Sequence, residues 1–207
     1  MHKHLPKHND GSAHFVTTST HRRTPLFEHA HCAMIVLEEL AFYRVQQQLK
    51  VFGYVVMPDH LHAIVWWDNE HRPELTISRL MQSIKGSVAR RIIDDIFELP
   101  TKQRSIEDRL DVLRRNLTLS SIQRHDDPHN RRHHRNLCYK IWQTSFHDFN
   151  IVSLDKLNEK LIYIHENPVR AGLCEKAEEY PFSSAWYYAG LEKPKGFTAP
   201  MCPVDEW

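Results

Sequence analysis

The sequence predicts an α+β domain built on a four-stranded antiparallel sheet with helices on one face. Strand-like segments rich in β-branched and aromatic residues alternate with segments of helical period. Two of the strand-like segments are joined by a short Pro-Asp turn, as in a hairpin. The hydrophobic share of 41% and the charged share of 26% are ordinary for a protein with a packed core. At 207 residues, we expect a single domain over residues 1–207.

The first half of the chain predicts a strand, a helix and a hairpin. Residues 13–20, AHFVTTST, carry the threonines and aromatics that favour a strand. After the basic turn HRRTP, apolar residues recur at helical spacing over about 27–48. Residues 51–67, VFGYVVMPDHLHAIVWW, are predicted to form two strands joined by a turn at Pro58 and Asp59.

The second half predicts two further helices and the last strand. A helix is expected over about 75–97, and residues 138–152, CYKIWQTSFHDFNIV, again resemble a strand. A third helix over 154–168 should end at its Asn-Pro pair, with Gly172 closing the turn. The order βαββαβα, with two helices on one face of the sheet, is the ferredoxin-like split βαβ arrangement.

A long segment between these elements lacks clean periodicity. It covers about residues 99–136, within a core of about 13–190, and we interpret it as an insertion. The stretch IEDRLDVLRRNL could form one amphipathic helical piece, and Arg131, Arg132 and Arg135 form a basic cluster. Loops of this length are usually functional or disordered. We therefore predict that the insertion is mobile without a ligand and helps to grip one.

Composition excludes several classes of protein. No run approaches the roughly 18 apolar residues of a membrane span, and the N-terminus lacks an apolar signal region, so a cytoplasmic protein is expected. The four cysteines include no CxxC pair, which argues against a disulfide framework or a thiolate zinc site. The net charge of +1 means that any nucleic acid must be bound through local basic patches.

Two histidines stand inside the apolar hairpin. Side chains alternate along a strand, so His60 and His62 point to one face and Leu61 to the other, which makes half a metal site. On the third helix, Tyr163 and Asn167 are four residues apart and share a face. An amide oxygen is a suitable hard ligand, and a phenol beside a metal is a competent nucleophile. Taken alone, a tyrosine at this position is more often a core or rim aromatic.

Several segments together resemble a known family. FVTTSTHRRTPLF, GYVVMPDHLHAIV, IWQTSFHDFNI, YIHENPVRAGL and YPFSSAWYYAG are similar in order and spacing to the REP-associated tyrosine transposases of the HUH single-tyrosine transposase superfamily. The resemblance covers about residues 13–190. It implies that Tyr163 is the nucleophile and that His60, His62 and Asn167 hold Mg²⁺ or Mn²⁺, although related transposases commonly have glutamine at the last position.

The same resemblance implies an activity and a partner. The enzyme would cut and rejoin single-stranded DNA at REP-like hairpins through a 5′-phosphotyrosine intermediate, as a monomer or a homodimer. Two other interpretations stay open: a metal-dependent nuclease without a covalent intermediate, and a non-catalytic DNA-binding regulator on a transposase scaffold. The basic residues expected to contact DNA are Arg22, Arg23, Lys85, Arg90, Arg91 and Arg170.

Overall fold

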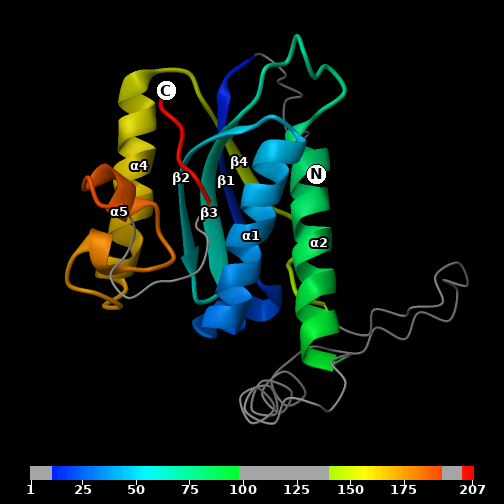
Figure 1. The fold of residues 1–207 in the computed structure, drawn as a ribbon, viewed down its shortest axis with the longest axis vertical. Coiled ribbons are helices and arrows are strands. Elements are labelled where there is room, and N and C mark those ends of the chain that lie inside the picture. Colours follow the sequence, from blue (N-terminus) through cyan, green and yellow to red (C-terminus); the bar gives the residue numbers. More distant parts are fainter. Residues whose placement is uncertain (1–10, 98–139, 193–201) are drawn as a thin grey trace, which may run out of the picture.

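A four-stranded antiparallel sheet forms the centre of the computed structural model, which describes residues 11–97, 140–192 and 202–207 (Figure 1). The strand order is β2-β3-β1-β4, which is the ferredoxin-like order, so the predicted fold class is confirmed. The strands are β1 (Ala13–Ser19), β2 (Lys50–Met57), β3 (His60–Trp66) and β4 (His147–Ile151).

Helices cover both faces of this sheet. Helices α1 (Ala30–Gln46) and α2 (Ile77–Phe97) pack on each other over one face, as predicted, and α4 (Leu154–Arg170) covers the opposite face (Figure 1). The remaining helical elements are single turns: η1 (His21–Arg23), η2 (Leu26–Glu28), η3 (Ala177–Glu179) and α5 (Ala185–Tyr188). No helix in the described parts of the chain combines the length and apolarity that crossing a membrane requires.

The end of α4 differs from the prediction. The helix does not stop at Asn167 but continues to Arg170 with Pro168 inside it, and Ala171 N–H still donates to Asn167 O at 3.0 Å. A proline inside a helix removes one backbone hydrogen bond. Pro168 is buried against the core, and this packing offsets the lost bond, which the local pattern could not reveal.

Gly172 closes the helix one turn later, as predicted. Its φ of +70° is the left-handed conformation that a residue without Cβ adopts most easily. Gly172 N–H donates to Val169 O and Leu173 N–H to Pro168 O, both at 2.9 Å. These two bonds are the Schellman arrangement that satisfies the last carbonyls of a helix.

The last strand is also shorter than predicted. It begins at His147 rather than near residue 138, and Trp142 forms only an isolated bridge with Thr20. Trp142 is buried in the core, so its apolar character reflects packing of a loop rather than a strand. The predicted insertion at 99–136 lies outside the described residues.

The outer edge of β2 is paired with the C-terminal part of the chain. Val56 N–H donates to Phe182 O at 2.8 Å, and Ser184 N–H donates to Tyr54 O at 2.9 Å. Asp205 N–H donates to Val51 O at 2.8 Å. An exposed strand edge is a template for unwanted pairing. Residues 182–184 and Asp205 therefore protect β2 and bring the C-terminal region against the sheet.

Candidate active site

The two histidines of β3 lie side by side on the face that α4 covers. The ring centroids of His60 and His62 are 4.7 Å apart, and the ring planes meet at 84°. The pairing register places Thr17 of β1 opposite His62 and Ser19 opposite His60. Because paired residues of antiparallel strands project to the same side, these four side chains share one face.

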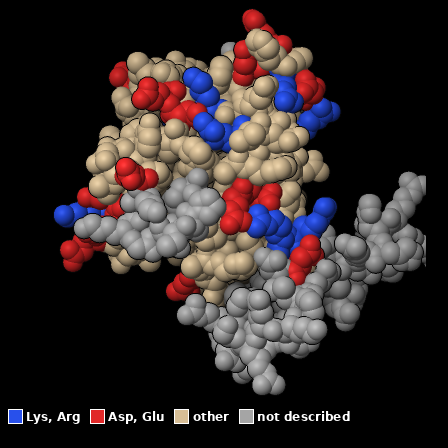
Figure 2. Space-filling model, viewed as in Figure 1, with Lys and Arg blue, Asp and Glu red and all other residues tan. Residues whose placement is uncertain are grey.

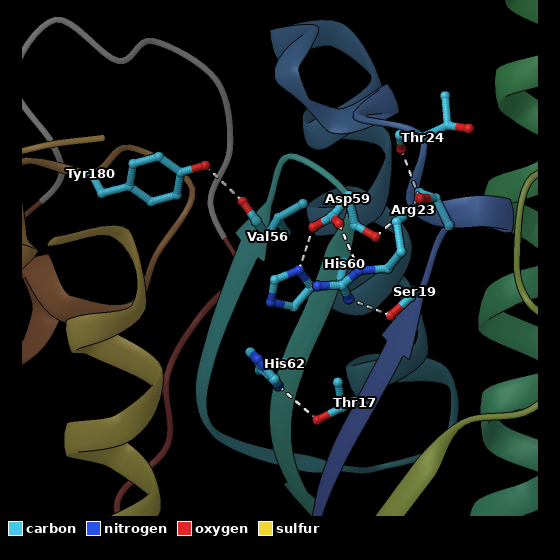
Figure 3. A network of polar contacts seen from close by, with 10 residues as sticks. Thr17, Ser19, Arg23, Thr24, Val56, Asp59, His60, His62 and Tyr180 are labelled. Carbon is cyan, nitrogen blue, oxygen red and sulfur yellow. Dashed lines mark hydrogen bonds and ion pairs between the residues drawn. The ribbon is translucent and has the colours of Figure 1, made fainter. Parts of the chain in front are cut away.

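Each histidine is held through its Nδ1 atom, as Figure 3 shows. His62 Nδ1 lies 2.7 Å from Thr17 Oγ1, and His60 Nδ1 lies 2.5 Å from Asp59 Oδ1. Metal-binding histidines are commonly oriented in this way, by a hydrogen bond on the nitrogen that does not bind the metal. His62 Nε2 is buried and has no hydrogen-bond partner among the described residues. The arrangement therefore fits a metal bound by the Nε2 atoms.

The environment of His62 keeps its ring neutral. The side chain is only 4% exposed. Burial, followed by the charges of His60, Arg23 and His147, lowers the pKa of His62 to about 3. A neutral imidazole retains the lone pair that a metal ligand must offer.

Helix α4 brings a phenol to these rings. The ring of Tyr163 lies 5.3 Å from the ring of His62 and 6.0 Å from that of Phe15, edge to face in both pairs. Tyr163 is 38% exposed as a residue, so a ligand from solvent can reach it. Arg170 Cζ lies 5.9 Å from the centre of the same ring. The fold thus joins the predicted nucleophile to the predicted histidine pair.

Asn167 follows Tyr163 by one helical turn, about 6 Å along the axis. Its Nδ2 donates to Tyr163 O at 2.7 Å, which leaves the amide oxygen for another partner. Helix α4 and β2 run in the same direction, so the C-terminal end of α4 lies toward the β2–β3 turn (Figure 1). Asn167 belongs to that end of α4, and β3 begins at His60 directly after the turn. In the described ranges, no cluster of three or more His, Cys, Asp or Glu could hold a metal. Among the described residues, the Asn167 amide oxygen is therefore the candidate third ligand beside the histidine pair.

Helix α4 is fixed to the sheet beside Tyr163. A Cβ on Gly53 would lie 2.5 Å from Leu161 Cδ2, so glycine allows the close approach of α4 to β2. His165 Nε2 lies 2.9 Å from Ser184 Oγ, and that hydroxyl also accepts from Tyr54 N–H at 2.9 Å. Burial lowers the pKa of His165 to about 4. The C-terminal region thus holds the helix that carries the phenol.

Other residues of the site were not singled out from the sequence. Thr17 and Asp59 orient the two histidines, and His147 of β4 pairs with Thr17, so it lies in the same cross-strand row as His62. His147 and Phe149 are two residues apart in a strand-like segment, so they are expected to share one face of a strand. This spacing is the sequence signal that could have identified His147. Local sequence does not indicate which strand an edge strand pairs with.

The predicted DNA-contacting residues divide into two groups. Arg23 lies at the site, with Nε 2.8 Å from Asp59 Oδ2, and the exposed Arg22 stands beside it in the same turn. Arg170 lies over Tyr163. Arg23 and Arg170 thus flank the face that carries the histidines, and Arg22 is next to Arg23 in the chain.

The three basic residues of α2 lie on the other side of the sheet. Lys85 Nζ donates to Gln143 O at 2.8 Å, and Arg91 pairs with Glu38 and Glu39 of α1, while Arg90 is exposed. On the face drawn in Figure 2, Lys and Arg side chains alternate with Asp and Glu instead of forming one basic area. The structure does not bring these α2 side chains to the site.

Comparison with known proteins agrees with this geometry. Residues 7–107 match the family model described as "Transposase IS200 like". A structure described as a REP-associated tyrosine transposase bound to a REP hairpin has a TM-score of 0.61 at 16% identity, covering 100% of this chain and 93% of the other. A candidate transposase from Deinococcus radiodurans R1 has a TM-score of 0.40 at 18% identity, covering 79% and 95% respectively. No curated protein matches the chain. The resemblance stated from the sequence is confirmed by the family match and by the shared fold.

Proposed function

We propose that this chain, whose residues 7–107 carry the pattern of the IS200-like transposases, cuts and rejoins single-stranded DNA through a covalent tyrosine intermediate. One observation carries the proposal. The exposed phenol of Tyr163 stands 5.3 Å, centre to centre, from the ring of His62, whose buried Nε2 has no partner among the described residues. A phenol that solvent can reach and a ring nitrogen available to bind a metal thus lie next to each other.

The protein groups that would hold a divalent ion are His60, His62 and Asn167. Two imidazole nitrogens and one amide oxygen suit Mn²⁺, and they admit Mg²⁺ with several waters retained. When bound, such an ion supplies Lewis-acid polarisation of the scissile phosphate. Thr17 and Asp59 keep the two imidazoles in the orientation and tautomer that binding requires.

Tyr163 supplies the attacking oxygen. The phenol loses its proton as its oxygen bonds to phosphorus, and the bond from phosphorus to the 3′ oxygen breaks. The products are a 5′-phosphotyrosine and a free 3′-hydroxyl. A phenol of ordinary pKa near 10 is a poor nucleophile at neutral pH, so the site must favour its ionised form during attack. Because the phosphodiester energy is conserved in the link, a 3′-hydroxyl can reverse the step without ATP.

The proposed substrate is a DNA hairpin resembling a REP palindrome. The neighbour of the same fold is described as bound to a REP hairpin, which supports this class of partner. Arg23 and Arg170 lie at the proposed site, and together with the exposed Arg22 beside Arg23 they would offer positive charge to phosphates. Arg170 and the exposed Phe149 also offer flat surfaces on which unpaired bases can stack.

Incubation with a library of single-stranded hairpins and Mn²⁺, followed by sequencing of the cleaved ends, tests the proposal. Wild type should yield a covalent protein–DNA band on a denaturing gel when the label lies 3′ of the cut, and none when it lies 5′. Tyr163→Phe should fold and bind the hairpin but form neither product nor adduct, because only the hydroxyl is lost. An adduct in this variant, or one carrying the other label, would show that another residue attacks or that the polarity is reversed.

The two histidines require a separate arm of the experiment. His60→Ala and His62→Ala should abolish cleavage and weaken Mn²⁺ binding while the fold is kept. Cleavage without any adduct in wild type would indicate the nuclease without a covalent intermediate. Hairpin binding without cleavage under any metal would indicate the non-catalytic regulator.

A further inference from the structure

A chain of three charged or polar side chains ends at His60. Arg23 Nε lies 2.8 Å from Asp59 Oδ2, and the second oxygen of that carboxylate lies 2.5 Å from His60 Nδ1. Arg23 Nη1 also donates to Ser19 Oγ at 2.8 Å (Figure 3). The guanidinium is therefore held at two points, and the carboxylate joins it to the histidine.

The backbone conformation of this turn directs the Arg23 guanidinium toward Asp59. Arg22 and Arg23 have φ angles of +55° and +58°, a conformation that residues with a side chain rarely adopt. Two such residues in succession persist only where the surroundings enforce them. The enforcing contacts come from Thr20, whose N–H donates to Asp59 O at 2.8 Å and whose hydroxyl lies 2.7 Å from Thr24 O and 3.0 Å from Asp59 O. The turn is thus bound to the same residue that its arginine contacts.

The ion pair between Arg23 and Asp59 contributes little to stability. Its arginine side chain is 53% exposed, and ion pairs of that kind contribute about 0–1 kcal/mol. Its geometric effect is larger. A carboxylate with one oxygen fixed by Arg23 presents the other oxygen to His60 Nδ1 and cannot rotate away. The side chain of His60 is 12% exposed, so its ring has few other orientations.

We propose that Arg23 is a positioning residue for the metal site, acting through Asp59 to aim His60 Nε2 at the ion. This inference rests on the proposed function, since it assigns a role toward the ion held by His60 and His62. It differs from the contact with DNA expected of Arg23 from the sequence. Support of a ligating histidine by a carboxylate typically changes metal affinity by about 10–100-fold. Arg23 acts one contact further away, and we expect its loss to weaken Mn²⁺ binding about 10-fold.

A double-mutant cycle tests this role on the full chain without DNA. Mn²⁺ dissociation constants are measured by calorimetry for wild type, Arg23→Ala, Asp59→Asn and the double variant, with thermal unfolding as the control for folding. Arg23→Ala should bind about 10-fold more weakly, and Asp59→Asn at least as weakly. In the Asp59→Asn background, Arg23→Ala should have almost no further effect, because its route to His60 is already lost.

Arg22→Ala is the matched control. Arg22 has the same charge and the same left-handed backbone, but the ion pair with Asp59 is made by Arg23. Loss of Arg22 should therefore leave Mn²⁺ affinity within about 2-fold of wild type, which is on the order of measurement error for independent sites. Arg23→Lys, which can retain one contact with Asp59, should recover part of the affinity.

Each alternative result has a distinct meaning. Wild type that binds no Mn²⁺ overturns the metal site itself and, with it, the role of Arg23. Wild type that binds Mn²⁺ while Arg23→Ala binds it equally well overturns only the inference. In that case, weaker hairpin binding by Arg23→Ala in a separate gel-shift titration would assign Arg23 to contact with DNA. Additive effects of Arg23→Ala and Asp59→Asn would likewise show that Arg23 does not act through Asp59.

Discussion

Protonation of His165 should loosen the helix that carries Tyr163. Burial holds the pKa of His165 at about 4, below the ordinary value of 6.5, so the folded protein prefers the neutral ring. A depressed histidine pKa means that stability is complete above about pH 6.5 and falls as the pH drops toward 4. The difference between the two pKa values corresponds to about 3 kcal/mol when protonation is complete, and to about 2 kcal/mol at pH 5. Since the ring is partly exposed, about 2 kcal/mol is an upper bound at that pH.

His165→Gln isolates this contribution. Glutamine keeps a polar group that can reach Ser184 Oγ but does not titrate. Urea unfolding followed by tryptophan fluorescence at pH 8 and pH 5 gives the free energy of unfolding for both proteins. Wild type should lose up to about 2 kcal/mol more than the variant between these pH values, because the other titrating groups are shared and cancel. Equal losses in the two proteins would show that His165 is not held neutral by the fold, and the reasoning from its burial would be wrong.

Three further perturbations separate the parts of the molecule. Thr17→Val removes the partner of His62 Nδ1 and should weaken Mn²⁺ binding about 10-fold in a calorimetric titration. Thr18→Val is the control, because it removes a buried hydroxyl with no partner in the described ranges and should change Mn²⁺ affinity little. Gly53→Ala should lower the free energy of unfolding by about 1–3 kcal/mol, because the new Cβ would lie 2.5 Å from Leu161 Cδ2. Adding Leu161→Ala removes that clash and should restore the packing of α4 on β2. Deletion of residues 99–136 should weaken salt-sensitive hairpin binding in a gel-shift titration and leave thermal unfolding cooperative; loss of folding would place the segment in the core.

Local patterns predicted the elements that depend on neighbours in the chain. The hairpin around Pro58 and Asp59 and the shared face of His60 and His62 follow from turn chemistry and from the period of two along a strand. The meeting of Tyr163 with His62 did not follow from period alone. It came from the resemblance to the transposases, because no local signal states which strand a helix will cover.

The features that the sequence did not predict depend on contacts between segments that are distant in the chain. Pro168 reads as a helix stop in isolation, but its burial carries α4 on to Arg170. Lys85 reads as a DNA-contacting cation, yet it binds the carbonyl of Gln143, 58 residues away in the chain. The role of Asp205 at the edge of β2 has no local signature either, since a single aspartate near a chain end is ordinarily a solvated charge.

The site consists of two halves with separate supports. Two of the three proposed metal ligands lie on the sheet, where Thr17 and Asp59 hold His62 and His60. The proposed nucleophile Tyr163 and the third proposed ligand, Asn167, lie on α4, and contacts outside the proposed active site, at Gly53 and Ser184, hold that helix in place. Changes at Gly53 and Ser184 should therefore impair adduct formation more than Mn²⁺ binding, because only one of the three proposed ligands lies on α4, and changes at Thr17 and Asp59 should impair both. The proposed covalent step requires that the phenol oxygen of Tyr163 be placed accurately relative to the histidines, because small displacements of reacting groups reduce rates steeply. The packing that fixes α4 against β2 is thus as necessary to the proposed reaction as the histidines themselves.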